Sequence, residues 1–147
     1  MEVKIKRLHP DARIPRYATP GSACFDLHNV NVEEAVVRHQ SPVVFRTGLS
    51  FEVPKGHVML IFSRSGHGFN NDCRLANCVG VIDSDYRGEV LVKLSSDASL
   101  GVSRLHIRQG DRIAQAMVIP VEQVSFVLCD ELSSTERGAG GCGSTGV

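Results

Sequence analysis

The chain has no tryptophan, and only 5% of its 147 residues are aromatic. No apolar run approaches the roughly 20 residues that a membrane-spanning helix needs. The formal net charge is zero, from sixteen basic and sixteen acidic residues, which argues against a protein that coats nucleic acid or an anionic membrane. The first seven residues alternate apolar and charged side chains and lack the apolar core of a secretory signal. The sequence therefore predicts an intracellular, cytoplasmic protein.

Cysteine is present in an odd number of five, at irregular spacing, which matches neither a disulfide framework nor a zinc site. Cys73 and Cys78, with His67 nearby, come closest to a metal cluster, but a structural zinc site normally needs four ligands. A zinc-dependent nucleobase deaminase would need His-x-Glu and Pro-Cys-x-x-Cys, and neither occurs here. We expect five reduced thiols.

Short β-branched runs bounded by Gly, Pro, Asn and Asp recur along the chain, and no long window keeps a helical period. The predicted strands cover residues 3–6, 43–45, 49–53, 57–62, 88–94, 104–107, 112–119 and 123–128. Residues 114–117 have helical propensity, but β-type residues flank them and Pro120 follows, so a strand is expected there. The length suits one domain with its own core, and the pattern favours an all-β sandwich or barrel.

The last fifteen residues, 133–147, are rich in Gly and Ser and are predicted to form a mobile arm outside the domain, which spans 1–132. Their glycine spacing formally matches a dinucleotide fingerprint and a P-loop. Both readings fail, because no strand precedes the glycines, no helix follows and the P-loop lysine is absent. A glycine-rich backbone beside Arg137, Ser144 and Thr145 can still present donors to phosphate oxygens, although a disordered tail is the alternative.

A polar loop at residues 80–89 interrupts two apolar runs and contains Asp83, Asp85, Tyr86 and Arg87 between glycines. Such a segment predicts a turn between strands. Binding and catalysis concentrate on loops of this kind, whereas an isolated Asp-x-Asp favours a solvated turn.

Three further segments carry polar residues that suit a ligand. Residues 63–66 place Arg64 beside hydroxyls and a glycine turn, which suits phosphate, although a surface turn is the simpler interpretation. Asp111 and Arg112 are expected to form a structural ion pair at a strand start, with Gln115 the better candidate for a ligand contact. Asp26 lies among small and apolar residues and needs a donor partner or a metal-bound water.

These segments occur in one order: 21–27 (GSACFDL), 63–66 (SRSG), 80–88 (GVIDSDYRG), 110–115 (GDRIAQ) and 137–146 (RGAGGCGSTG). In this order and spacing they closely resemble the five motifs of the trimeric dUTPases (deoxyuridine triphosphate nucleotidohydrolases). The resemblance spans nearly the whole chain.

The resemblance implies a β jelly roll of the β-clip type that assembles as a homotrimer. Its three active sites would lie between subunits, each closed by the arm of a neighbour. The implied reaction is hydrolysis of dUTP to dUMP and pyrophosphate, which limits uracil incorporation into DNA and supplies dUMP for dTMP synthesis. Mg2+ would be held mainly by the triphosphate and water, with Asp26 near that water or paired with an arginine.

The same resemblance assigns roles to individual residues. Asp83 matches the carboxylate that deprotonates the water attacking the α-phosphorus and holds the sugar 3′-hydroxyl. Tyr86 matches the ring that packs against deoxyribose and excludes a 2′-hydroxyl. The segment that contacts the uracil edge corresponds to Asn77, Gly80, Val81 and Ile82. The other expected substrate-binding residues, several of them phosphate contacts, are Arg64, Ser65, Gly66, Leu91, Gln115, Arg137, Cys142, Gly143, Ser144 and Thr145.

The chain departs from the family pattern at two cysteines. Cys142 occupies a position that is usually aromatic, commonly Phe, where the ring stacks on uracil. Because base–aromatic stacking contributes roughly 1–3 kcal/mol, we expect weaker closure of the arm with activity retained. Cys24 replaces a common Gly, with an effect on local packing only.

Two other functions compete with this interpretation. A dCTP deaminase of the same fold superfamily would lack the Ile-Asp-x-Asp-Tyr loop that is intact here, and ammonia release from dCTP would reveal it. A non-catalytic nucleotide sensor would explain Cys142 but not the retention of Asp83, Arg64, Gln115 and Arg137.

Overall fold

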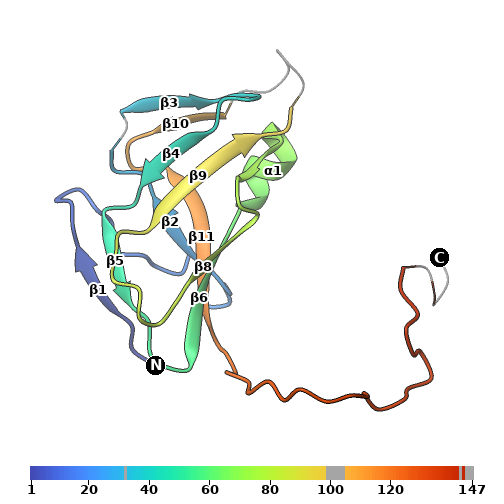
Figure 1. Ribbon diagram of the computed structural model, residues 1–147. Coiled ribbons are helices and arrows are strands. Elements are labelled where there is room, and N and C mark those ends of the chain that lie inside the picture. Colours follow the sequence, from blue (N-terminus) through green and yellow to red (C-terminus); the bar gives the residue numbers. More distant parts are fainter. Residues whose placement is uncertain (32, 99–104, 143, 145–147) are drawn as a thin grey trace.

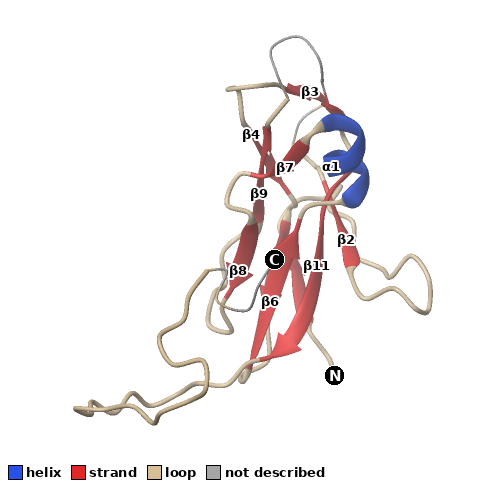
Figure 2. Ribbon diagram, turned by 90° about the vertical axis from the view of Figure 1, so that its right-hand side faces the viewer, coloured by secondary structure: helices blue, strands red, loops and turns tan. Residues whose placement is uncertain are grey.

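Four antiparallel strands form the main sheet of the computed structural model, which describes residues 1–31, 33–98, 105–142 and 144. Their order across the sheet is β2 (Phe25–His28), β11 (Arg112–Pro120), β6 (His57–Phe62) and β8 (Val79–Ile82). Figure 2 shows these four strands side by side, with β6 and β11 the most prominent. Antiparallel ladders of this kind allow one face to pack on a core while the other meets solvent.

A second, three-stranded sheet and two strand pairs complete the fold (Figure 1). The second sheet has the order β4 (Val43–Arg46), β9 (Leu91–Ser96) and β7 (Cys73–Leu75). The antiparallel pairs are β1 (Lys4–Arg7) with β5 (Leu49–Glu52), and β3 (Glu34–Val37) with β10 (Leu105–Arg108). The architecture is the jelly-roll-like all-β fold that the sequence predicts.

The core follows from alternation along the strands. In β9, Val92, Leu94 and Ser96 are buried while Leu91 and Lys93 are exposed, as the two-residue period of a strand requires. The largest fully buried side chains include Phe45, Leu27, Leu49, Met59 and Leu75. Burial of such a side chain stabilises a fold by about 1.5–3 kcal/mol, so the core fixes which face of each strand is free to carry polar chemistry.

The helix α1 (Ser65–Asn71) lies where the sequence predicts only a turn. Gly66 and Gly68 lower its intrinsic helix propensity, so sequence alone does not indicate it. The helix ends at Asp72, which has φ 48° and donates its backbone N–H to the Gly68 carbonyl. Among the described residues, no helix is long and apolar enough to cross a membrane.

The strand predicted at 123–128 is wrong for the single chain. The last strand ends at Pro120, and the Val121 backbone N–H still donates to the Gly56 carbonyl. Beyond it the chain runs away from the domain (Figure 1), with Phe126 94% and Leu128 99% exposed. A strand needs a neighbour for its backbone groups, and no described part of this chain lies beside the segment. The other predicted strands are confirmed within a few residues, with residue 104 outside the described residues.

Candidate functional site

Strand register brings three of the five sequence motifs together. Asp26 on β2 lies opposite Gln115 on β11, and Gln115 lies opposite Phe62 on β6. The Gln115 side-chain amide donates to the Ser63 carbonyl at 2.9 Å. The residues after β6, which begin the second motif, are therefore fixed beside the first and fourth motifs.

Asp26 lies between two arginines. Arg64 donates from Nε to one carboxylate oxygen at 3.2 Å, and Arg112 donates from Nη1 to the other at 3.3 Å. The Asp26 side chain is only 18% exposed, so its charge is shielded from water and held by charge-assisted bonds, which are stronger than neutral ones. The donor partner predicted for Asp26 is thus a pair of guanidinium groups.

The predicted ion pair between Asp111 and Arg112 is wrong. Asp111 instead accepts the backbone N–H of Arg108 at 2.8 Å, closing the turn between β10 and β11. Arg112 begins β11 and turns to Asp26 on the neighbouring strand. Successive residues of an extended chain face opposite sides, which explains why the two neighbours have different partners.

A cavity of about 360 Å³ opens beside Asp26 and is lined by Ser22, Arg64, Ser65, Arg112 and Gln115. Guanidinium, hydroxyl and amide groups are the donors that recognise phosphate. We call this the Arg64 cavity. Gly66 follows Ser65 within α1 and has open space around its Cα, so a ligand could approach the backbone closely there.

His67 lies behind Arg64 and is buried, with 7% exposure. Its Nε2 is 3.4 Å from Arg64 Nη1. Burial, followed by the positive charges of Arg64 and Arg112, lowers the pKa of His67 to about 4. A neutral imidazole can accept from the guanidinium, whereas a protonated one would repel it, so His67 is suited to hold Arg64 in place. From the sequence alone, His67 stands out only as a neighbour of Cys73 and Cys78.

The third motif contains the predicted polar loop, and in the structure residues 83–90 connect β8 to β9. Asp83 is exposed, and it lines a separate cavity of about 1000 Å³ together with Lys55, His57, Val81 and Asp85. We call this the Asp83 cavity. A carboxylate exposed to a solvent-filled cavity is available to accept a proton from water.

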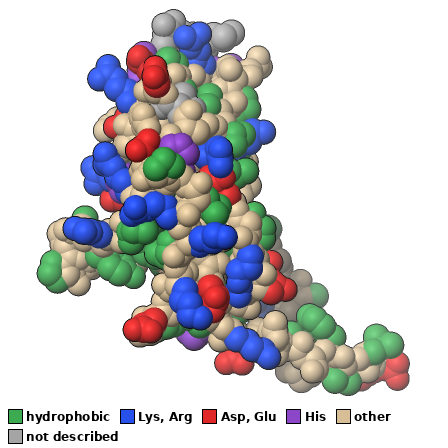
Figure 3. Space-filling view, turned by 90° about the vertical axis from the view of Figure 1, so that its left-hand side faces the viewer, with side chains coloured by type: hydrophobic (Ala, Val, Ile, Leu, Met, Phe, Trp, Pro, Cys, Tyr) green, Lys and Arg blue, Asp and Glu red, His purple; other side chains and the backbone are tan. Residues whose placement is uncertain are grey.

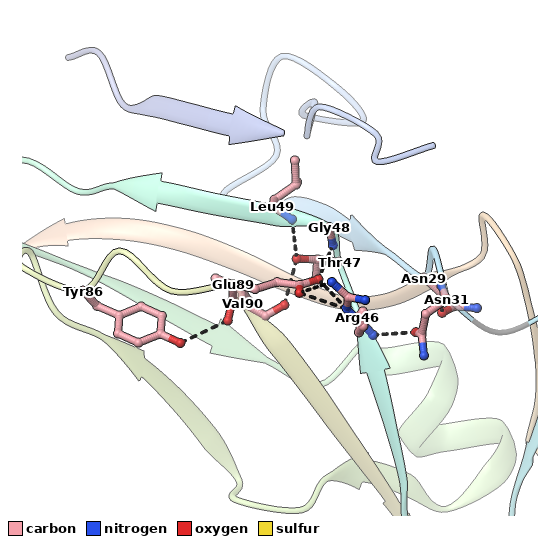
Figure 4. A network of polar contacts seen from close by, with 9 residues as sticks. All are labelled: Asn29, Asn31, Arg46, Thr47, Gly48, Leu49, Tyr86, Glu89 and Val90. Atoms are coloured by element: carbon pink, nitrogen blue, oxygen red, sulfur yellow. Dashed lines mark hydrogen bonds and ion pairs between the residues drawn. The ribbon is translucent and has the colours of Figure 1, made fainter. Parts of the chain in front are cut away.

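The base of this loop is fixed by Glu89 (Figure 4). Arg46 donates to Glu89 through both Nε, at 2.9 Å, and Nη2, at 2.7 Å, and the Gly48 backbone N–H donates to the same carboxylate at 2.8 Å. Glu89 raises the pKa of Arg46 through these bonds and its charge. The Ser50 hydroxyl also donates to the Arg87 carbonyl at 2.6 Å. No sequence motif indicated these anchors, because their partners are about 40 residues apart.

Tyr86 packs within its own loop. Its hydroxyl donates to the Glu89 carbonyl at 3.1 Å (Figure 4), and a Cβ added at Gly88 would lie 2.3 Å from that hydroxyl oxygen. Only glycine at position 88 allows this placement of the ring. Leu91, at the start of β9, is 54% exposed.

Asn77 occupies a corner between the two sheets. β7 pairs with β9 and β8 pairs with β6, so the strands on either side of Asn77 do not pair with each other. Cys78 adopts φ 62° in this corner, and both residues are exposed. Gly80 is buried against Ile61, where a Cβ would lie 3.0 Å from the Ile61 Cβ, whereas Val81 is 60% exposed and Ile82 half-buried.

The C-terminal arm extends away from the domain (Figure 1), and none of its described residues lines the Arg64 cavity or the Asp83 cavity. Arg137 donates from Nε to the Gly140 carbonyl at 3.0 Å, while the Gly140 N–H donates back to the Arg137 carbonyl. Cys142 and Ser144 are exposed. The predicted contacts Gly143 and Thr145 lie outside the described residues.

The two cavities share no lining residue. Ile82 pairs with Met59, so Asp83 is level with Val58 near the start of β6, whereas Arg64 follows the end of β6. Six residues of extended chain separate these levels, about 20 Å at 3.3 Å per residue. Within one chain the Asp83 cavity and the Arg64 cavity are therefore separate.

A divalent cation held by the protein alone would need clustered ligands. The described residues contain no group of three His, Cys, Asp or Glu side chains suited to that, and the Asp26 carboxylate is already shared by two arginines. These residues fit a hydrated cation that arrives with a polyphosphate, since Mg2+ prefers to keep several waters.

Comparison with known proteins identifies the family. The dUTPase family model matches residues 10–146. A deoxyuridine 5′-triphosphate nucleotidohydrolase of Helicobacter pylori is 41% identical over 147 residues, covering 100% of this chain and 98% of its own. A Staphylococcus phage 80alpha dUTPase solved with dUpNHpp has a TM-score of 0.89 at 24% identity, covering 99% of both chains. A phage phi11 dUTPase, described with a structural Mg(II) ion, has a TM-score of 0.76 at 22% identity, covering 89% of this chain and 98% of its own. The two structures show a shared fold.

Proposed function

The chain belongs to the dUTPase family, and we propose that it hydrolyses dUTP to dUMP and pyrophosphate in the cytoplasm. The observation that supports this best is the convergence of Arg64, Ser65 and Gln115 on one cavity with Asp26 behind them. These donors suit a triphosphate chain, and the exposed carboxylate of Asp83 suits activation of water.

Asp83 acts as the general base in this proposal. It accepts the proton of the water that attacks the α-phosphorus in line, while the pyrophosphate group leaves. The protein supplies no covalent nucleophile, so its contribution is positioning and neutralisation of charge. The hydrogen bonds from Arg46 and Gly48 to Glu89 contribute to this positioning, because they fix the loop on which Asp83 lies.

Each active site is shared between subunits of a homotrimer. The separation of the Asp83 cavity from the Arg64 cavity within one chain supports this arrangement, since a neighbouring copy can bring the two together. The exposed apolar segment at 123–128 supports it as well, because a segment with Phe126 and Leu128 almost fully exposed needs a partner surface. The arm then carries Arg137, Cys142, Gly143, Ser144 and Thr145 to a neighbour's site.

Specificity for deoxyuridine comes from two segments, the corner at Asn77 with the strand β8 that follows it, and the loop at residues 83–90. Backbone groups near Asn77, Gly80, Val81 and Ile82 pair with the uracil edge, and cytosine is rejected because it leaves buried polar groups unpaired. The Tyr86 ring, held by Glu89 and Gly88, leaves no room for a 2′-hydroxyl. Leu91 completes the substrate contacts.

Mg2+ enters with the triphosphate in this proposal. The ion would supply neutralisation of charge on the phosphate oxygens, and Asp26 would be the carboxylate available to its water shell. The residues of this chain orient the same oxygens through Arg64 and Gln115.

The test is pyrophosphate release from dUTP, with dCTP, dTTP and UTP in parallel and with Mg2+ or a chelator. We expect fast, Mg2+-stimulated turnover of dUTP alone. The Asp83→Asn variant should lose about 10²–10⁴-fold in kcat while KM changes little. Turnover that is equal in the variant, or ammonia release from dCTP, would rule out the assignment.

A further inference from the structure

A third cavity, which shares Asp26 and Arg112 with the Arg64 cavity, contains unusually many positive charges. It measures about 600 Å³, and its lining includes Arg7, Arg13, Arg16 and Arg112, with Asp26 as the only carboxylate. We call it the arginine cavity. The chain as a whole has no net charge, so this concentration is a local feature. Figure 3 shows Lys and Arg side chains spread over the face of the molecule that carries β1, the strand of Arg7.

Three of these four arginines lack an acidic partner within the described part of the chain. Among the described residues, Arg7, Arg13 and Arg16 form no ion pair, and the one carboxylate of the cavity is shared by Arg64 and Arg112. A guanidinium group without a carboxylate is suited to bidentate binding of phosphate oxygens. The cavity size also falls within the range of small-molecule sites.

The cavity is held open by fixed contacts. Gln109 donates from its side chain to Asp11 at 3.1 Å, which ties the loop before Arg13 to the turn at Gly110. The Arg13 guanidinium lies against Gly110, where an added Cβ would be 2.5 Å from Arg13 Nη2. Gly110 has φ 82°, so both the turn and this close contact require glycine.

His28 reports the positive potential in this cavity. Burial lowers the pKa of His28, and the charges of Arg13, Arg112 and Arg64 lower it further, against the opposite effect of Asp26. Its Nδ1 is buried and has no hydrogen-bond partner. The charges of three guanidinium groups thus act on His28 in the same direction, in agreement with the arginine-rich lining of the cavity.

We propose that the arginine cavity is a binding site for a condensed phosphate anion of the pyrophosphate class, separate from the Arg64 cavity. Arg13 and Arg16 provide the main contacts. The two cavities meet at Asp26 and Arg112, so an anion in the arginine cavity competes with Asp26 for Arg112. This site does not depend on the proposed hydrolysis, because it rests on charges that lie outside the Asp83 loop.

Calorimetric titration of the full chain with pyrophosphate, at two salt concentrations, tests the proposal. We expect saturable binding that weakens at higher salt and that is reduced about tenfold or more in Arg13→Gln/Arg16→Gln, since two charge-assisted contacts are lost. Arg38→Gln is the matched control, because Arg38 is exposed and does not line the cavity. Thermal melting confirms that each variant is folded, and the single Arg16→Gln variant, on an exposed loop, replaces the double variant if that one does not fold.

Arg64→Gln separates the two cavities. Binding that persists in Arg64→Gln but falls in Arg13→Gln/Arg16→Gln supports the arginine cavity. The reverse pattern places pyrophosphate in the Arg64 cavity and overturns the proposal, as does the absence of saturable binding. A parallel titration with ATP shows whether the phosphate chain of a nucleotide is accepted: equal affinities identify the chain of phosphates as the recognised group, and selectivity for pyrophosphate identifies the free anion.

Discussion

Asp83 and Arg64 lie at opposite ends of β6, with their backbones about 20 Å apart along an extended chain. The register of β8 against β6 fixes this separation, because Ile82 pairs with Met59 and Val79 with Phe62. A side chain cannot span that distance. If both residues contact the same phosphate groups, we expect them to come from different copies of the chain.

Complementation between inactive variants tests this relationship. Asp83→Asn and Arg64→Gln should each be inactive, but co-expression should restore activity, because a mixed trimer contains interfaces with both residues intact. Random assortment at equal amounts predicts about one quarter of the wild-type sites. Differently tagged subunits allow mixed trimers to be purified and their dUTP hydrolysis measured. Mixed trimers with no activity would place the whole site within one chain.

Restoring an aromatic residue in the arm should improve catalysis. We expect Cys142→Phe to raise kcat/KM about five- to tenfold, because stacking on the base contributes at least about 1 kcal/mol. Cys129→Phe is the matched control, since Cys129 is also exposed but precedes the arm and lies outside the last motif. Equal kinetics for wild type and Cys142→Phe would show that the arm does not stack on the base.

Removing the Glu89 carboxylate should loosen the loop that carries Asp83. In Glu89→Ala, Arg46 and the Gly48 N–H lose their shared acceptor, and we expect Tm to fall by about 2–4 °C together with a lower kcat. Glu52→Ala serves as the comparison, because Glu52 pairs with Lys4 on the surface, where ion pairs contribute little. A Tm loss of the same size in both variants would contradict a specific role for Glu89.

The neutral state of His67 makes stability depend on pH. Above pH 6.5 the imidazole is neutral in both the folded and the unfolded chain. Below it the unfolded chain binds a proton that the folded chain does not bind until about pH 4, so the free energy of unfolding falls as pH falls from 6.5 to 4. The total loss from this group is about 3 kcal/mol, at 1.36 kcal/mol per pKa unit.

Denaturant unfolding at several pH values measures this effect. His67→Gln should show a smaller loss of stability than wild type between pH 6.5 and 4, with the remainder including His28, whose pKa is also lowered. Parallel curves for wild type and variant would mean that His67 is protonated in the folded protein.

The local structure of the strands could be predicted from sequence because it depends on alternation and on turn residues. The apolar alternation at 49–53 and the apolar run at 57–62 correspond to β5 and β6, and the polar interval after Ile82 corresponds to a loop. Helix α1 could not be predicted, since its glycines disfavour a helix and only its surroundings fix it. The segment at 123–128 has the composition of a strand, but its partner is not within the described chain.

The candidate site also has features that the sequence predicts and features that only the tertiary structure fixes. The sequence by itself determined which chemical groups are present, namely the carboxylate of Asp83, the guanidinium of Arg64 and the amide of Gln115, and their order along the chain. Only the tertiary structure decided that Asp26 pairs with Arg64 and Arg112, that Glu89 anchors the Asp83 loop, and that Asp83 and Arg64 are held apart. These relationships depend on strand register, which is set by packing between residues far apart in sequence. Strand register therefore cannot be predicted from a local sequence pattern.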